Sequence, residues 1–176
     1  MSQQRIAQLK TAFNLQAHPE GGYYAEQYRA DTTVNSPVDG MPRSSMSHIY
    51  FLLTKGDVSR WHKVLHDEIW NVYEGAPLRI LSLRGQTLTD EVIGNPAPNP
   101  APNSGEELDN NKLEPGLEYF KIIEGGDYQA AESTGEYTFV GCTVAPGFEF
   151  TDFSYIEDDA TKTIVEGKKR DYAKFL

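Results

Sequence analysis

Hydrophobic and polar residues alternate in short runs over most of the chain after residue 22. The runs are rich in valine, isoleucine, threonine and aromatic residues, and glycine, proline, asparagine or aspartate separates them. A period of two with such boundaries predicts β-strands. Strands are expected over residues 23–29, 48–54, 59–65, 68–73, 78–83, 87–93, 117–123, 137–145 and 148–156.

The first residues follow a different period. Ile6, Leu9 and Phe13 recur at helical spacing, and Pro19 with the glycine pair 21–22 ends the pattern. This predicts one short N-terminal helix. So many strands with almost no helix between them must pair antiparallel, so the predicted fold class is all-β, a sandwich or barrel of the jelly-roll type.

Two segments depart from the strand rhythm. Residues 95–116 repeat Asn-Pro and Ala-Pro and contain no hydrophobic run, which predicts an inserted surface loop. Residues 157–176 are charged and weakly patterned, and they are interpreted as a C-terminal tail along the outside of the barrel. The chain of 176 residues is expected to form one domain, residues 1–176, with a core at about 12–156.

Charge narrows the classes of partner. The 26 acidic and 16 basic residues give a net charge of −10, which repels phosphate backbones and anionic lipid, so neither nucleic acid nor a membrane is expected as a partner. The single cysteine, Cys142, lies in an apolar run and is interpreted as a buried, inert thiol. Without a signal-like or membrane-spanning apolar run, a cytoplasmic location is expected.

The candidate chemistry is concentrated in residues 56–75, GDVSRWHKVLHDEIWNVYEG. Strand alternation places Arg60, His62 and Val64 on one face. If residues 65–67 form a hairpin turn, Glu68 faces His62 from the returning strand. An imidazole opposite a carboxylate in an apolar-walled site can hold a divalent metal or act as a base.

The spacing of this stretch resembles the first signature of the cupin superfamily. That signature has a glycine, a histidine, a second histidine two residues later, a glutamate and a glycine. Gly56, His62, Glu68 and Gly75 match it, whereas Val64 stands in place of the second histidine. Of the second cupin signature only Gly126 matches, and Gln129 stands in place of its histidine.

Three segments resemble one uncharacterised branch, the fifth cupin subfamily: HPEGGYYAEQYR (18–29), SRWHKVLHDEIWNVYEG (59–75) and VGCTVAPGFEFTDF (140–153). The resemblance spans residues 12–156. It implies a double-stranded β-helix (the cupin jelly-roll barrel) and a homodimer. It also implies a distant similarity to sugar-nucleotide epimerases that use this barrel without a metal.

The resemblance also implies where a metal would bind, at positions 62, 64, 68 and 129. Here they hold His62, Val64, Glu68 and Gln129, and the alkyl group and the neutral amide remove two strong ligands. No cofactor is therefore expected. A divalent metal held by His62, Glu68 and Gln129 is the less favoured alternative, with His66 as a further ligand if it turns inward; a solvated turn histidine is favoured for His66.

The remaining candidates surround His62. Tyr50 or Tyr73 would be the acid partner of His62, and Arg60, facing inward, would hold an anionic group of a ligand. Trp70 and Phe148 are candidate pocket walls, and Glu20 and Gln129 are candidate ligand contacts. Core packing is the favoured interpretation for each aromatic residue taken singly, and a structural hydrogen-bonded turn for Glu20. An ion pair with Glu68 or Glu20 explains Arg60 equally well.

Three functional hypotheses remain open. The first is a metal-independent isomerase or epimerase that acts on a small polar ligand, either carbohydrate-related or anionic, with His62 as base and Glu68 orienting it. The second is a non-catalytic module that binds a small molecule in the same pocket. The third is a metal-dependent cupin oxygenase or isomerase. For His62, attraction to Glu68 is expected to outweigh burial and raise the pKa.

Overall fold

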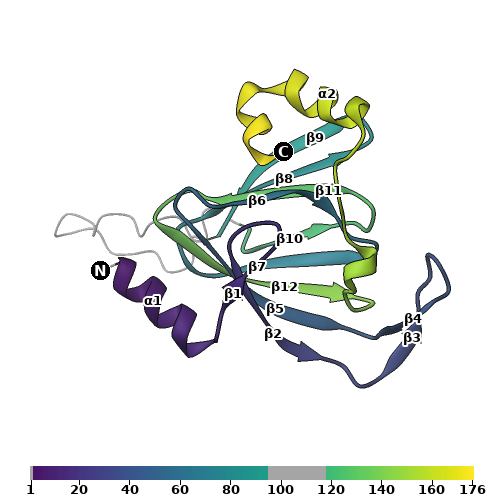
Figure 1. Ribbon diagram of the computed structural model, residues 1–176, viewed down its shortest axis with the longest axis horizontal. Helices are drawn as coiled ribbons and strands as arrows, with labels where there is room; N and C mark the ends of the chain where they lie inside the picture. The colour runs from purple at the N-terminus through teal and green to yellow at the C-terminus, as the bar shows by residue number, and fades with distance from the viewer. Residues whose placement is uncertain (1, 95–117) are drawn as a thin grey trace, which may run out of the picture.

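The computed structural model describes residues 2–94 and 118–176, so the predicted loop 95–116 lies outside the described residues. Two antiparallel sheets face each other and form the barrel (Figure 1). The larger sheet has the order β1 (Gln16–Ala17), β2 (Tyr23–Arg29), β5 (Ser47–Thr54), β12 (Tyr137–Ala145), β7 (Asp67–Gly75) and β10 (Phe120–Ile123). The smaller has the order β13 (Ser154–Tyr155), β6 (Val58–Lys63), β11 (Tyr128–Ser133), β8 (Leu78–Arg84) and β9 (Thr87–Ile93). The predicted all-β jelly-roll fold is confirmed.

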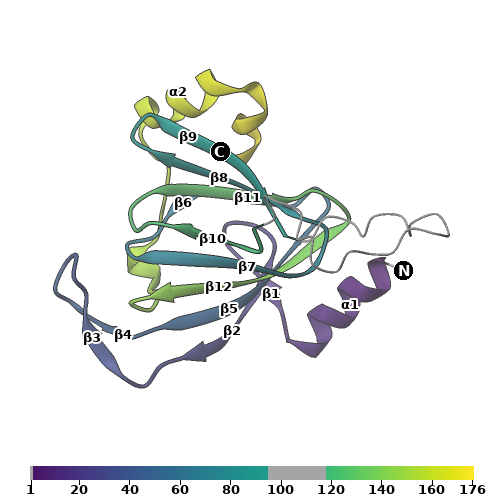
Figure 2. The same ribbon diagram turned by 180° about the vertical axis from the view of Figure 1, so that it is seen from behind.

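A third, two-stranded sheet forms an arm. Its strands are β3 (Thr33–Asn35) and β4 (Pro42–Ser44), and the hairpin projects from the barrel in both views (Figures 1 and 2). Buried Ser36 and Arg43 fasten the arm through side-chain contacts to His66 and Asp152. The alternation pattern did not predict this arm, because its strands are too short to show a period.

Three hydrophobic clusters follow from the alternation of side chains along the strands. One lies between the sheets and includes Phe51, Trp70 and Val140. A second covers the outer face of the larger sheet, where Ile6 and Leu9 of helix α1 (Ser2–Ala12) pack against Leu52 and Phe139. The predicted N-terminal helix therefore serves as a cover for that face.

The third cluster covers the outer face of the smaller sheet. The C-terminal tail forms helix α2 (Asp159–Lys168) and the 3-10 helix η2 (Arg170–Phe175), which lie over that sheet in Figure 1. Their buried residues Val165, Tyr172 and Phe175 pack with Trp61 and its neighbours. The tail is thus folded and carries apolar anchors that its weak pattern concealed.

Two strand predictions need correction, and one strand was missed. Residues 148–156 are irregular apart from the 3-10 helix η1 (Phe150–Asp152), with only β13 as strand. The predicted strand 59–65 ends at Lys63 as β6. Strand β11 was not predicted, because Tyr128–Ser133 contains small and polar residues, yet it is central in its sheet and fully buried at Gln129. Burial there comes from both neighbouring strands and from the opposite sheet.

Candidate functional site

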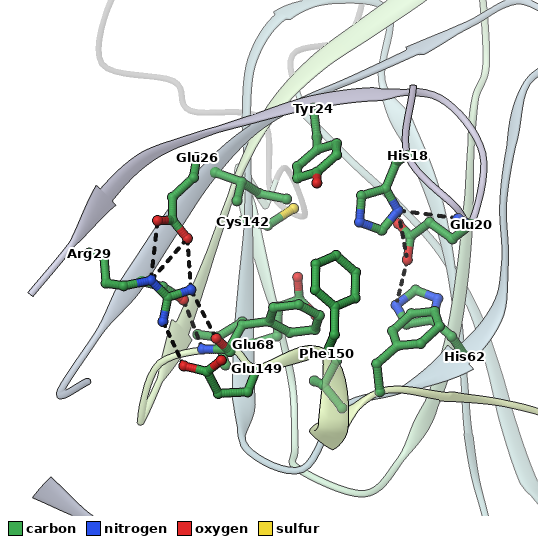
Figure 3. A pocket seen from close by; sticks show the side chains of 16 residues that line it. His18, Glu20, Tyr24, Glu26, Arg29, His62, Glu68, Cys142, Glu149 and Phe150 are labelled. Atoms are coloured by element: carbon green, nitrogen blue, oxygen red, sulfur yellow. Dashed lines mark hydrogen bonds and ion pairs between the residues drawn. The ribbon is translucent and has the colours of Figure 1, made fainter. Parts of the chain in front are cut away.

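A cavity of about 290 Å³ opens between the two sheets. Figure 3 shows acidic and imidazole side chains on one side of it and an arginine held between two glutamates on the other. Among the predicted residues, Glu20, His62, Glu68 and Phe148 line the cavity, and Val64 lines it as well. The other walls come from His18, Tyr24, Glu26, Arg29, Ser47, Ile49, Cys142, Val144, Glu149, Phe150 and Phe153.

A β-bulge in β6 brings His62 to the cavity. Gln129 pairs with His62 and Ala131 with Ser59, so two residues, Arg60 and Trp61, stand opposite Ala130 alone. Such a bulge shifts the alternation by one residue. His62 is consequently buried at 2% exposure, while Arg60 on the same strand is exposed.

The prediction that Arg60 faces into the barrel is therefore wrong. Its guanidinium contacts the carbonyl oxygen of Leu176 at 2.8 Å and lies over the ring of Tyr155 on the outside of the barrel. The cation that does line the cavity is Arg29, whose guanidinium binds Glu26 at 2.8 Å and Glu149 at 3.0 Å. Its charge is already balanced by two carboxylates.

Glu20 reaches the cavity from a tight turn before β2. Gly21 has φ +113°, and a Cβ there would lie 2.0 Å from the carbonyl oxygen of Val58, so only glycine allows this close approach to β6. The Glu20 carboxyl accepts a hydrogen bond from the Ser59 hydroxyl at 3.0 Å, and its other oxygen lies 3.2 Å from His62 Nε2. The direct carboxyl partner of His62 is thus Glu20, and not Glu68 as predicted.

Gln129 lies between His62 and Glu68. Its amide nitrogen is 3.1 Å from His62 Nε2 and 2.5 Å from Glu68 Oε2, and its carbonyl oxygen accepts from the Trp70 indole N–H at 2.9 Å. Gln129, predicted as a ligand contact, and Trp70, predicted as a pocket wall, do not line the cavity but lie behind its wall. They position the residues that do.

Burial sets the protonation states of the ionisable side chains that line the cavity. It raises the pKa of Glu20 to about 8 and that of Glu68 to about 7. It lowers the pKa of His18 to about 4 and also lowers that of His62, where ionised Glu68 opposes the effect only in part. The expected rise of the His62 pKa is therefore wrong, because desolvation of the imidazolium outweighs attraction to the carboxylate.

His18 provides a second imidazole in the wall. Its Nδ1 accepts a hydrogen bond from the backbone N–H of Glu20 at 3.2 Å, which leaves the proton of the neutral ring on Nε2. The sequence places His18 beside Glu20, but nothing in the pattern distinguished a ligand contact from a structural turn. Cys142 also lines the cavity, and burial raises the pKa of its thiol well above the usual value, which keeps it protonated.

The predicted acid partners Tyr50 and Tyr73 lie elsewhere. Inward positions of β5 and β7 include Ile49 and Glu68, so the alternating residues Tyr50 and Tyr73 face the outside of the larger sheet. There their rings pack edge to face at 5.9 Å. Neither phenol can donate a proton into the cavity from that face.

His66 is also placed differently from the prediction. It is buried rather than solvated, and its Nε2 lies 2.8 Å from the Ser36 hydroxyl of the arm. It does not line the cavity and is not available as a further metal ligand beside His62.

The residues at the implied metal positions do not fit a metal ion. The Nε2 of His62 and the Oε2 of Glu68 both face the amide nitrogen of Gln129, and Val64 offers only an alkyl group. Across residues 2–94 and 118–176, no group of three or more His, Cys, Asp or Glu side chains is arranged to hold a metal ion.

Comparison with known proteins places these observations in a family. A sequence profile of the family described as "Cupin superfamily (DUF985)" matches residues 7–156. No curated protein matches the chain. In the part of the chain that the structure describes, no helix is long and apolar enough to cross a membrane.

Solved structures share the fold over nearly the whole chain. A hypothetical protein from Leishmania major has a TM-score of 0.76 and 24% identity, with 96% of each chain covered. A protein from Shewanella oneidensis has a TM-score of 0.74 and 26% identity, covering 96% of this chain and 94% of that one. A mutant of Bacillus subtilis oxalate decarboxylase has a TM-score of 0.53 and 11% identity, covering 94% of this chain and 38% of that one.

Proposed function

This chain belongs to the cupin superfamily, in the family described as DUF985, and we propose that its cavity carries out metal-independent acid–base chemistry on a small polar ligand. The observation that carries the proposal is the Glu20–His62 pair, with 3.2 Å between Oε2 and Nε2 in the wall of the cavity. A proton held between a carboxyl group and an imidazole can be given to a ligand or accepted from it.

The protonation of the wall supports this chemistry. Glu20, with a pKa of about 8, is protonated at neutral pH and can act as an acid, and neutral His62 can act as a base. His18 is a second neutral imidazole in the same wall. An isomerase or epimerase needs proton removal beside a carbonyl and return of a proton, which these groups can supply.

The walls favour a neutral, carbohydrate-related ligand over an anionic one. Arg29 is already bound by two carboxylates, so an anionic ligand would have to displace them. Aromatic side chains of Tyr24, Phe148 and Phe153 offer faces on which a sugar ring can pack. The volume of about 290 Å³ lies near the lower end of the roughly 300–1,000 Å³ typical of ligand pockets, which restricts the ligand to small molecules.

The test is exchange of carbon-bound hydrogen with solvent. The protein is incubated in D2O with a panel of small aldoses, ketoses and their deoxy derivatives, with a chelator present, and deuterium beside the carbonyl is followed by 1H NMR and mass spectrometry. We expect exchange that falls by about 100- to 10,000-fold in Glu20→Gln and in His62→Asn, the range typical of lost acid–base catalysis. Tyr73→Phe, on the outer face, is the matched control and should exchange as the wild type does.

The other outcomes identify the alternatives. Binding of a sugar in saturation-transfer NMR without any exchange would mean a non-catalytic binding module. Exchange that needs added metal would mean a metal-dependent cupin. A panel in which no sugar binds or exchanges would contradict the carbohydrate-related ligand.

A further inference from the structure

We propose that the side-chain amide of Gln129 takes the place of the metal ion, as a fork of two hydrogen-bond donors that joins His62 to Glu68. The amide nitrogen lies 3.1 Å from His62 Nε2 and 2.5 Å from Glu68 Oε2. In a metal-binding barrel these two atoms would donate lone pairs to a cation. Here Glu68 Oε2 and His62 Nε2 each accept one hydrogen of a neutral amide, and at His62 the Glu20 carboxyl group, 3.2 Å away, shares the same Nε2 lone pair.

The orientation of the amide follows from Trp70. The indole N–H is only a donor, and it lies 2.9 Å from Gln129 Oε1, so that atom must be the carbonyl oxygen. Both hydrogens of the amide nitrogen are thereby directed away from Trp70, toward His62 and Glu68. Gln129 and Trp70 are 0% and 1% exposed, so no water competes for these bonds.

The tautomer of His62 agrees with this assignment. Its Nδ1 lies 2.7 Å from the carbonyl oxygen of Arg60, which can only accept, so Nδ1 carries the proton. The lone pair of the neutral ring is then on Nε2, facing Gln129. A histidine that ligates a metal through Nε2 is commonly oriented by this same kind of bond from Nδ1. His62 is therefore oriented like a metal ligand by its bond to the Arg60 carbonyl, but the amide N–H of Gln129 stands where the cation would be.

The amide also joins the two halves of the barrel. His62 and Gln129 belong to β6 and β11 of the smaller sheet, whereas Glu68 and Trp70 belong to β7 of the larger sheet. A metal shared between these strands would crosslink the sheets in the same place. Gln129 is a positioning residue, because it acts on a ligand through His62 and Glu68.

This inference rests on the metal-free character of the proposed function, but it does not depend on catalysis. It identifies Val64 and Gln129 as the two positions that keep metal out. Val64 lines the cavity beside His62 with only an alkyl group, and Gln129 occupies the lone pairs of the two remaining ligands. Restoring an imidazole at both positions should complete a set of three histidines and one glutamate.

The experiment measures Zn²⁺ and Ni²⁺ binding by equilibrium dialysis, in the wild type, Val64→His, Gln129→His and the double variant, all without affinity tags. We expect the double variant to bind one metal ion at least about 100-fold more tightly than the wild type, since the loss of supporting residues alone costs up to about 100-fold. Phe148→His is the control that adds an imidazole to the cavity outside the Gln129 fork, and it should not differ from the wild type.

A second measurement on the wild type keeps the test independent of whether the variants fold. Long-range 1H–15N NMR should show His62 as the Nδ1–H tautomer, unchanged by stoichiometric Zn²⁺. Stoichiometric Zn²⁺ that shifts or broadens the His62 resonances, or an Nε2–H tautomer, would overturn the inference. So would a folded double variant with the wild-type affinity for metal.

The two proposals fail separately. Suppose that no sugar exchanges hydrogen, while wild-type His62 is the Nδ1–H tautomer and its resonances do not change with Zn²⁺. The catalytic proposal is then wrong, and the role of Gln129 stands. If the wild type binds Zn²⁺ through His62, the role of Gln129 is wrong whatever the exchange assay shows.

Discussion

The inner and outer faces of the larger sheet carry similar residues in different environments. Toward the cavity, Gln129 joins Glu68 to the buried imidazole of His62, and Tyr24 packs edge to face against His18 at 4.4 Å. On the outer face, His48 Nδ1 lies 2.8 Å from the Thr143 hydroxyl, and the half-exposed Tyr73 hydroxyl lies 3.4 Å from His48 Nε2. Each face therefore has a histidine with polar partners.

The difference lies in what burial does to these groups. On the cavity side, desolvation raises the pKa of Glu68 to about 7, and the buried amide of Gln129 satisfies the carboxylate. On the outer face, burial lowers the pKa of His48 as well, but Tyr73 is 50% exposed and water can replace its partners. A histidine beside a tyrosine is thus not a site by itself. Enclosure and perturbed protonation set the inner group apart.

The largest contrast is expected in stability when a hydrogen-bonding side chain is removed from each face. Gln129→Leu removes the acceptor of the Trp70 indole N–H, the amide donor to Glu68 Oε2 and one of the partners of His62. The free energy of unfolding should therefore fall by about 3 kcal/mol, because each buried unsatisfied group costs about 1–3 kcal/mol. Tyr73→Phe should change it by less than about 0.5 kcal/mol. Urea denaturation measures both values, and equal losses would remove the contrast.

Between pH 6.5 and 8, the pH dependence of stability should come mainly from the inner face. The pKa of Glu20 is about 8 in the folded state, above its unfolded value near 4.5, so the folded protein binds more protons and its stability falls as the pH rises toward 8. Below pH 6.5 the lowered pKa values of His18 and His62 give the opposite slope, since folding then disfavours their protonation. The two effects offset each other there, and the fall becomes clear between pH 6.5 and 8.

Glu20→Gln tests the origin of this fall, because glutamine has no proton to lose. The variant should show a smaller loss of unfolding free energy between pH 6.5 and 8, by at most about 1.4 kcal/mol per pH unit. His48→Asn on the outer face is the control and should retain the wild-type slope. A Glu20→Gln variant with an unchanged slope would assign the fall to other groups.

Titration of His62 gives a smaller but more specific effect. Burial lowers its pKa and ionised Glu68 raises it in part, so Glu68→Gln should lower the pKa further. NMR titration of the imidazole resonances measures the shift, and His48 in the same spectra serves as the internal reference. A His62 pKa that rises in Glu68→Gln would show that the carboxylate does not stabilise the imidazolium.

The smallest loss of stability is expected at Gly141, where side chains on the outer face of the larger sheet can move to make room. A Cβ at Gly141 would lie 2.2 Å from the Tyr73 hydroxyl and 2.6 Å from His48. Both contacts are to side-chain ends, and Tyr73 can move toward solvent. Gly141→Ala should therefore cost less than about 1 kcal/mol and leave hydrogen exchange of sugars in the cavity unchanged. A loss of more than about 3 kcal/mol would mean that the outer cluster is as rigid as the inner one.

The sequence by itself determined the all-β class, most of the barrel strands apart from β11, the N-terminal helix and the presence of His62 and Glu68 near one site. These follow from local period and spacing, which residues within one strand or hairpin share. The positions of Glu20 and Phe148 in the cavity wall also agree with the sequence-based expectation.

Only the tertiary structure decided which groups meet. The bulge at Arg60 and Trp61 turned Arg60 outward, and it depends on pairing with β11, a strand whose sequence shows little β pattern. Glu20 meets His62 because a glycine turn approaches β6 closely, across about forty residues of chain. Gln129 joins strands from two sheets, and burial then sets the protonation of the groups it contacts. Pairing between distant strands and desolvation are properties of the folded chain, so no local pattern of residues could encode them.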